Sequence, residues 1–160
     1  MEQAMIRFKK LHEKAVLPKY QHASDAGADL HAVEDVMIPP GEWRLIRTGL
    51  AVELPDRPVQ GFETPGGFQL WMEGQVRPRS GLALKKGITA LNAPGTIDAG
   101  YRKEIGVILV NHSKEDFIIQ PGDRIAQLVF NLVVRPAQMV FTEALNETER
   151  KGGFGHTGTG

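Results

Sequence analysis

The sequence predicts an all-β fold of short strands, and three observations support this prediction. Short apolar runs rich in Val, Ile, Leu and Phe recur along the chain, and turn-forming segments such as PPGE, PGT, NHSKED and QPGD separate them. No segment keeps a helical period for long. Short strands separated by Gly/Pro turns are typical of a β-sandwich or barrel. A chain of 160 residues is long enough for one domain, residues 1–160, with its own core.

The apolar runs give the predicted strands in order. Strands are expected at residues 28–33, 35–39, 44–54, 104–111, 116–120, 124–134 and 138–141. Between the third and fourth of these, the stretch from Pro55 to Gln75 is longer than a connection between two strands requires. It carries Phe62, Phe68 and Trp71 among several Gly and Pro residues. We interpret it as an extended hairpin or insertion, which either packs its own aromatic rings or presents them to a partner.

One short helix is predicted within RSGLALKKG, residues 79–87. Ser80 suits the N-cap, the residues from Leu82 to Lys86 are strong helix formers, and Gly87 suits the left-handed C-terminal position. The backbone N–H groups at the start of such a helix, flanked by Arg79, favour a bound anion.

Overall composition excludes several classes of function. Nineteen basic residues balance nineteen acidic ones, so there is no electrostatic reason to expect binding to nucleic acid or to an anionic membrane. Cysteine is absent, which excludes disulfides and thiolate metal sites. The N-terminus lacks the pattern of a secretory signal, and the apolar runs are too short to span a bilayer. We therefore expect a soluble, cytoplasmic protein.

Two carboxylates are candidates for chemistry. The segment LNAPGTIDAGYRKEIGVILVN, residues 91–111, predicts a β-hairpin whose tip holds Asp98 and Tyr101 close together. Asp98 is either a catalytic group or a turn residue that bonds its own backbone, and Tyr101 is either a site residue or ordinary packing. Asp29 is either a turn residue or a carboxylate aimed at Mg²⁺, which binds one or two carboxylates together with substrate phosphates. The histidines show no zinc-site spacing.

The C-terminal stretch RKGGFGHTGTG, residues 150–160, contains five glycines and one aromatic residue, Phe154. Glycine loses more backbone freedom on ordering than any other residue, so this stretch does not hold a fixed shape alone. It is either a frayed terminus or a mobile lid that orders over a ligand.

Taken together, these segments resemble the trimeric deoxyuridine triphosphatases (dUTPases), which carry five motifs in a fixed order. AGADLHA is similar to the first motif, PRSGLA to the second and GTIDAGYRKEI to the third. GDRIAQLV is similar to the fourth motif and GGFGHTG to the fifth. The resemblance runs from about residue 26 to the C-terminus, and five motifs in the right order are a specific signal.

The resemblance implies a jelly-roll-like, distorted β-barrel with a flexible C-terminal arm, assembled as a homotrimer with shared active sites. The implied reaction is hydrolysis of dUTP to dUMP and pyrophosphate with Mg²⁺ bound to the triphosphate. Asp98 matches the aspartate that activates water for attack on the α-phosphate, and Tyr101 the ring beneath the deoxyribose. The other matched positions are Asn92, Gly95, Thr96 and Ile97 for uracil, Arg79, Ser80, Gly81 and Gln127 for phosphate, Asp29 for metal-bound waters, Phe154 for stacking on uracil, and Arg150, His156 and Thr157 for phosphate contacts of the tail.

The chain departs from the family pattern at a few positions. The usual RGxGGF of the tail reads RKGGF here, one residue shorter between Arg150 and Phe154. His156 replaces a serine, Lys103 stands where glycine is common, and the 55–75 connection is longer than usual. Two alternatives are a dCTP deaminase-like enzyme, which shares the fold but lacks the hairpin tyrosine, and a regulatory protein that acts through residues 55–75.

Overall fold

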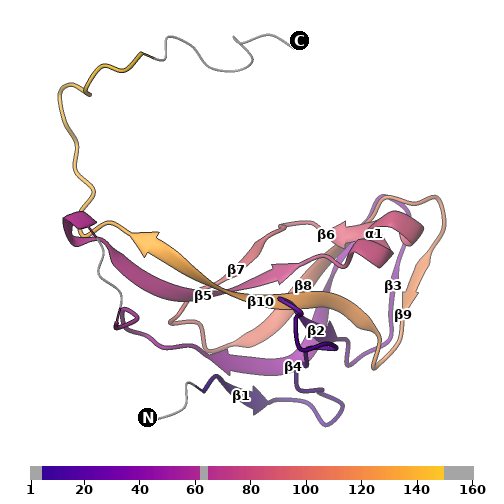
Figure 1. The fold of residues 1–160 in the computed structure, drawn as a ribbon. Helices are drawn as coiled ribbons and strands as arrows, with labels where there is room; N and C mark the ends of the chain where they lie inside the picture. Colours follow the sequence, from indigo (N-terminus) through magenta and orange to yellow (C-terminus); the bar gives the residue numbers. More distant parts are fainter. Residues whose placement is uncertain (1–4, 62–64, 150–160) are drawn as a thin grey trace.

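The computed structural model describes residues 5–61 and 65–149, and in these residues it forms a jelly-roll-like, all-β fold, as predicted (Figure 1). One antiparallel sheet has the order β1-β4-β8-β6, a second the order β2-β10-β5-β7, and β3 pairs with β9. The first sheet contains β1 (Arg7–Lys10), β4 (Trp43–Glu53), β8 (Glu104–Asn111) and β6 (Ile88–Ala90). The second contains β2 (Ala28–His31), β10 (Arg124–Arg135), β5 (Gln69–Arg77) and β7 (Gly95–Ile97), and the third β3 (Val36–Ile38) and β9 (Phe117–Ile119).

The core consists of apolar side chains contributed by all three sheets. Along β8, the buried residues Ile105, Val107 and Leu109 alternate with partly exposed ones, as expected for a strand with one face on the core. Leu30 of β2 and Leu128 of β10 join them in the same cluster. Full burial of a Leu or Ile side chain contributes about 1.5–3 kcal/mol, so this cluster dominates the stability of the fold.

The helix α1 (Ser80–Lys86) is present as predicted, but Ser80 is its first residue and not its N-cap. Arg79 occupies the N-cap with extended backbone and makes no side-chain capping bond. The helix therefore begins one residue earlier than the capping preference of serine predicts. The prediction for the C-terminal end of α1 is confirmed, since Gly87 has φ 64° and its N–H donates to the carbonyl of Ala83.

Both ends of the described chain differ from expectation. The charged stretch Arg7–Lys10 forms strand β1, which the sequence did not indicate, because its backbone pairs with β4 from Leu50 to Glu53. The strand predicted at 138–141 is wrong, since β10 ends at Arg135 and no strand follows in the described residues. Figure 1 shows the chain beyond β10 leaving the sheets, and the side chains of Met139 and Phe141 are exposed. An apolar run becomes a strand only where another strand is available to pair with it.

The segment 55–75 contributes a major strand to the fold. Its last third, residues 69–75, belongs to β5, which pairs with β10 from Gln69 opposite Arg135 to Arg77 opposite Gln127. The chain before β5 folds back on this strand, where the N–H of Val59 donates to the carbonyl of Leu70 at 2.8 Å. β4 and β5 themselves belong to different sheets. Trp71 packs beneath the guanidinium of Arg135, 4.5 Å from the ring centre.

Candidate active site

A cavity of about 370 Å³ gathers residues that are far apart in the sequence. β2, the start of α1 and β10 meet around it, because β10 pairs with β2 on one side and with β5, which leads into α1, on the other. Five of the predicted site residues line it, namely Asp29, Arg79, Ser80, Gly81 and Gln127. The sequence interpretation had placed four of these against phosphate and Asp29 near the metal, and the structure brings all five together.

Two arginines share the carboxylate of Asp29 in this cavity. The Nε of Arg79 lies 3.2 Å from one carboxylate oxygen, and a terminal nitrogen of Arg124 lies 3.3 Å from the other. The Asp29 residue is only 7% exposed. A guanidinium carries five N–H donors, so these contacts leave further donors for a ligand. Two cations around one anion make the cavity attractive to an additional negative group.

Arg124 was missed by the sequence interpretation, although it follows Asp123 directly within the GDRIAQLV segment. Its pairing with Asp29 across β2 and β10 could not be seen without the strand register. The same strand places Gln127, whose amide nitrogen donates to the carbonyl of Pro78 at 2.9 Å. A side chain at Gly27 would collide with Gln127, since a Cβ there would lie 2.2 Å from the Gln127 Oε1. The small residues before Asp29 therefore make room for this glutamine.

His31 lies at the end of β2 next to the arginine cavity. Its Nδ1 is buried and has no hydrogen-bond partner among the described residues. Burial lowers the pKa of His31 below its ordinary value of 6.5, the carboxylate of Asp29 opposes this effect, and Arg124 and Arg79 add to it. The imidazole is therefore neutral at pH 7.

The donor set of the cavity suits a divalent cation that arrives with phosphates. In the described part of the chain, no group of three or more His, Cys, Asp or Glu side chains is placed to hold a metal. Asp29 offers a single carboxylate, and both of its oxygens contact arginines. Mg²⁺ is commonly bound through one or two carboxylates together with substrate phosphates and waters. Asp29 fits that type of site and does not form a cage alone.

A second cavity, of about 160 Å³, contains the predicted base- and sugar-contacting residues. Asn92, Gly95, Thr96, Ile97 and Tyr101 line it. The Asn92 side chain lies against Gly95, where a Cβ would be 3.2 Å from the Asn92 amide nitrogen. Backbone atoms of a strand such as β7 hold their donors and acceptors at fixed positions, so a flat ring entering here would meet a rigid hydrogen-bonding edge.

The predicted proximity of Asp98 and Tyr101 is confirmed. The N–H of Tyr101 donates to the carbonyl of Asp98 at 2.9 Å, which closes a β-turn. The strands on either side, β7 and β8, belong to different sheets, so the turn is a corner between sheets and not the tip of a ladder-paired hairpin. Arg102, which sequence reasoning did not single out, bonds the carbonyls of Ala99 and Leu54 and holds this corner against the end of β4.

Asp98 does not line the arginine cavity of its own chain. It lines a third hollow, of about 380 Å³, together with Trp71, Glu73 and Arg135. Ile97 pairs with Gly74 on β5, and about five residues of extended chain, or about 17 Å, separate Gly74 from Arg79. One chain therefore carries the candidate base and the candidate phosphate contacts at separate places. The remaining predicted residues, Arg150, Phe154, His156 and Thr157, lie outside the described residues.

The fold and these cavities define an all-β protein with an arginine-lined pocket of the kind that binds anions. A family model described as dUTPase matches residues 13–158. The chain belongs to the dUTPase family. A protein of Nautilia profundicola is 51% identical over 96% of this chain and 98% of its own length, and one of Gloeothece citriformis is 49% identical over 96% of both. Both are named deoxyuridine 5'-triphosphate nucleotidohydrolase, so the expected enzyme class agrees with that of the relatives.

Solved structures give the same result for the fold. The dUTPase of Staphylococcus bacteriophage 80alpha with dUpNHpp has a TM-score of 0.76 and 27% identity, covering 98% of this chain and 100% of that one. A mutant dUTPase from phage phi11 of S. aureus, described with a structural Mg(II) ion, has a TM-score of 0.71 and 25% identity over 90% of this chain. In the described residues of our structure, no helix is both long and apolar enough to cross a membrane.

Proposed function

We propose that this protein hydrolyses dUTP to dUMP and pyrophosphate. The strongest support is that this chain, a member of the dUTPase family, carries two cavities of different character. One is lined by arginines, and the other is lined by Tyr101 and the backbone of β7. The first suits a polyphosphate, because guanidinium groups bind phosphate oxygens through paired N–H donors. The second suits a uracil ring with its sugar against Tyr101. The reaction would supply dUMP and keep uracil out of DNA, and the cytoplasm is the expected location.

Asp98 is the proposed general base. Its carboxylate would accept a proton from a water molecule as that water attacks the α-phosphorus, and pyrophosphate would leave. A carboxylate can do this when it lies within hydrogen-bond reach of the water. The β-turn closed by Tyr101 and braced by Arg102 fixes the backbone of Asp98. Arg79 and Arg124 would offset the charge of the phosphates in the other half of the site.

We propose that the working enzyme is a homotrimer with shared active sites. The separation of Asp98 from the arginine cavity within one chain supports this, because both groups must reach the same triphosphate. The exposed apolar side chains at Met139, Phe141 and Leu145 on the departing chain support it as well, since such a segment gains stability by packing on a neighbour. The glycine-rich residues 150–160 would then close over substrate in a neighbouring subunit, with Phe154 over the uracil.

Mg²⁺ is the proposed cofactor. When bound to the triphosphate it would neutralise charge and hold the phosphates in one geometry. Asp29 is the residue proposed to contact its water shell. Because Asp29 also contacts Arg79 and Arg124, its carboxylate would keep both arginines in place until the phosphates take over some of their donors.

Pyrophosphate release from dUTP, dCTP, dTTP and UTP, each with and without Mg²⁺, tests the proposed function. We expect rapid release from dUTP alone and a strong dependence on the metal. Comparable turnover of the other nucleotides would contradict the proposed roles of the base cavity and Tyr101. Deamination of dCTP would indicate the alternative enzyme.

A regulatory role is a second candidate, and one observation favours it. The exposed hollow that contains Asp98 is also lined by Trp71 and Arg135, which come from the longer 55–75 connection and the end of β10. A partner that docked on this hollow would contact Asp98 directly. The phage 80alpha dUTPases are described as controlling transfer of virulence genes. A Trp71→Ala variant that hydrolyses dUTP normally but no longer exerts the regulatory effect in cells would support this role.

A further inference from the structure

Tyr101 is fixed at both ends by hydrogen bonds within its own corner. Its backbone N–H bonds the carbonyl of Asp98, and its hydroxyl donates to the backbone carbonyl of Glu104 at 2.7 Å. The position of the Tyr101 ring therefore depends on where the backbone of Glu104 lies. Ile105 and Gly106, the next two residues along β8, line the same cavity as Tyr101. The start of β8 is thus part of the wall of the base and sugar cavity.

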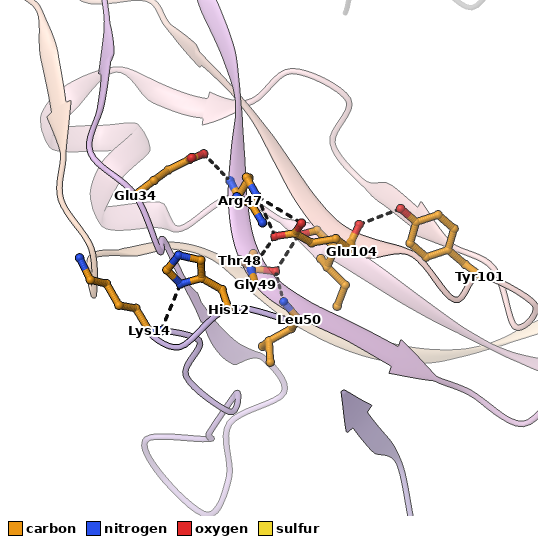
Figure 2. Close-up of polar contacts among 10 residues, drawn as sticks. His12, Lys14, Glu34, Arg47, Thr48, Gly49, Leu50, Tyr101 and Glu104 are labelled. Carbon is orange, nitrogen blue, oxygen red and sulfur yellow. Dashed lines mark hydrogen bonds and ion pairs between the residues drawn. The ribbon is translucent and has the colours of Figure 1, made fainter. Parts of the chain in front are cut away.

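The carboxylate of Glu104 ties this start of β8 to β4. One oxygen accepts the backbone N–H of Gly49 at 2.8 Å, and the Nε of Arg47 lies 3.2 Å from both oxygens. Figure 2 shows Glu104 between these two groups on one side and the Tyr101 hydroxyl on the other. The Glu104 side chain is 25% exposed, so the contact is partly screened from water.

The carboxylate acts at a break in the sheet. The pairing of β4 with β8 shifts register between Arg47 and Ala51, and Gly49 within this shift has φ 66°. A backbone N–H at such a bulge loses its regular ladder partner, and Glu104 supplies one. The neighbouring residue Thr48 is buried, and its hydroxyl donates to the carbonyl of Ile105 at 2.6 Å. Side chains thus replace ladder bonds at this point.

We propose that Glu104 is a positioning residue that sets the Tyr101 ring and thereby the preference for deoxyribose over ribose. This rests on the proposed function, which places the sugar against Tyr101. Arg47 contributes by orienting the Glu104 carboxylate toward Gly49. The role differs from simple reinforcement of the bulge, because a displaced Tyr101 ring changes which sugar fits, whereas a weakened sheet lowers activity toward every nucleotide alike.

The test compares Glu104→Ala and Glu104→Gln in the full chain, with kcat and KM measured for dUTP and for UTP. In Glu104→Ala we expect KM for dUTP to rise about fivefold, kcat to fall less, and the preference for dUTP over UTP to fall about tenfold. Glu104→Gln should recover most of this preference, since its amide oxygen can still accept the Gly49 N–H. Glu42→Gln is the matched control, because Glu42 forms an ion pair with Arg44 beside the same strand.

A second readout does not require catalysis. Hydrogen exchange of the peptide covering residues 98–106 should quicken in Glu104→Ala and match the wild type in Glu42→Gln. Binding of dUMP and UMP should show the same loss of preference. If the wild type fails to hydrolyse dUTP, the proposed function is wrong, and exchange and binding still decide the role of Glu104. An unchanged preference for dUTP over UTP in Glu104→Ala would overturn the inference, even where hydrogen exchange quickens or thermal stability falls.

Discussion

Asp29 and Arg79 form an ion pair of 3.2 Å that joins β2 to the N-terminus of α1 across the arginine cavity. The carboxylate is nearly buried, whereas the arginine side chain keeps 27% of its surface exposed. Arg124 completes the arrangement from β10. The segments AGADLHA, PRSGLA and GDRIAQLV are thereby connected through one aspartate.

Asp29→Asn should loosen both arginines while keeping the size of the side chain. Because the neutral amide no longer balances two cations, we expect a loss of about 1–3 kcal/mol in unfolding free energy, reduced from the value for fully buried pairs by the exposure of the arginines. KM for dUTP should rise. Urea unfolding and steady-state kinetics measure the two effects. A variant with wild-type stability and wild-type KM would show that Asp29 does not organise the cavity.

Asp98→Asn should separate binding from chemistry. The amide fits the same turn but cannot accept a proton from water, so pyrophosphate release should fall by at least about 100-fold. Affinity for a non-hydrolysable dUTP analogue, measured by calorimetry, should stay within a few-fold. Asp116→Asn, an exposed aspartate before β9, is the control. Near-normal turnover would remove Asp98 as the base.

Mixing two inactive variants tests whether subunits share a site. Asp98→Asn and Arg79→Ala each damage one half of the site, and the two halves lie at separate places on one chain. If each site draws its halves from different subunits, refolding the two variants together at equal amounts should restore about a quarter of wild-type activity. Without any recovery, the site would have to be built within one subunit, and the trimer proposal would fail in that respect.

Removal of residues 150–160 tests the proposed lid. These residues lie outside the described part of the chain, so the prediction rests on their composition and on the family resemblance. Turnover of dUTP should drop severely because water enters an open site, while sedimentation should still report a trimer. Full activity of the truncated protein would contradict the lid.

Stability should fall as pH drops below neutral because of His31. Its pKa is lowered in the folded protein, mainly by burial, so the unfolded chain binds the proton more readily. The contribution is fully present above the ordinary pKa of 6.5 and is lost as pH falls through the folded value. His31→Gln should flatten the dependence of the unfolding free energy on pH between about 7 and 5. An equally steep dependence in His31→Gln and in the wild type would contradict this origin.

Local patterns predicted the strands with clear apolar alternation and the helix up to Gly87. They also predicted the turn that holds Asp98 near Tyr101, because the relevant interactions span only a few residues. The strand at Arg7–Lys10 and the absence of one at 138–141 depend on which backbone is available for pairing. The pairing of β1 with β4 joins residues forty or more positions apart, so a local pattern carries no trace of it.

In the candidate site, too, local sequence motifs were predictable and long-range contacts were not. The resemblance to family motifs identified several of the residues that line the two cavities, including Gln127 and Asn92. Arg124, Arg102 and Glu104 were missed because their roles arise from bonds to residues far away in the sequence. Arg102 reaches the carbonyl of Leu54, and Glu104 reaches the N–H of Gly49. Such residues look like ordinary surface charges until the strand register is known.

The stacking of Arg135 on Trp71 gives the molecule a built-in optical reporter. The chain has two tryptophans, and the other, Trp43, is 58% exposed on the opposite sheet. Indole emission is sensitive to a neighbouring cation and to water, and Trp71 shares a hollow with Asp98. In a Trp43→Phe background, the fluorescence of this single indole would report ligand binding beside Asp98 in real time, without a label and without detection of a product.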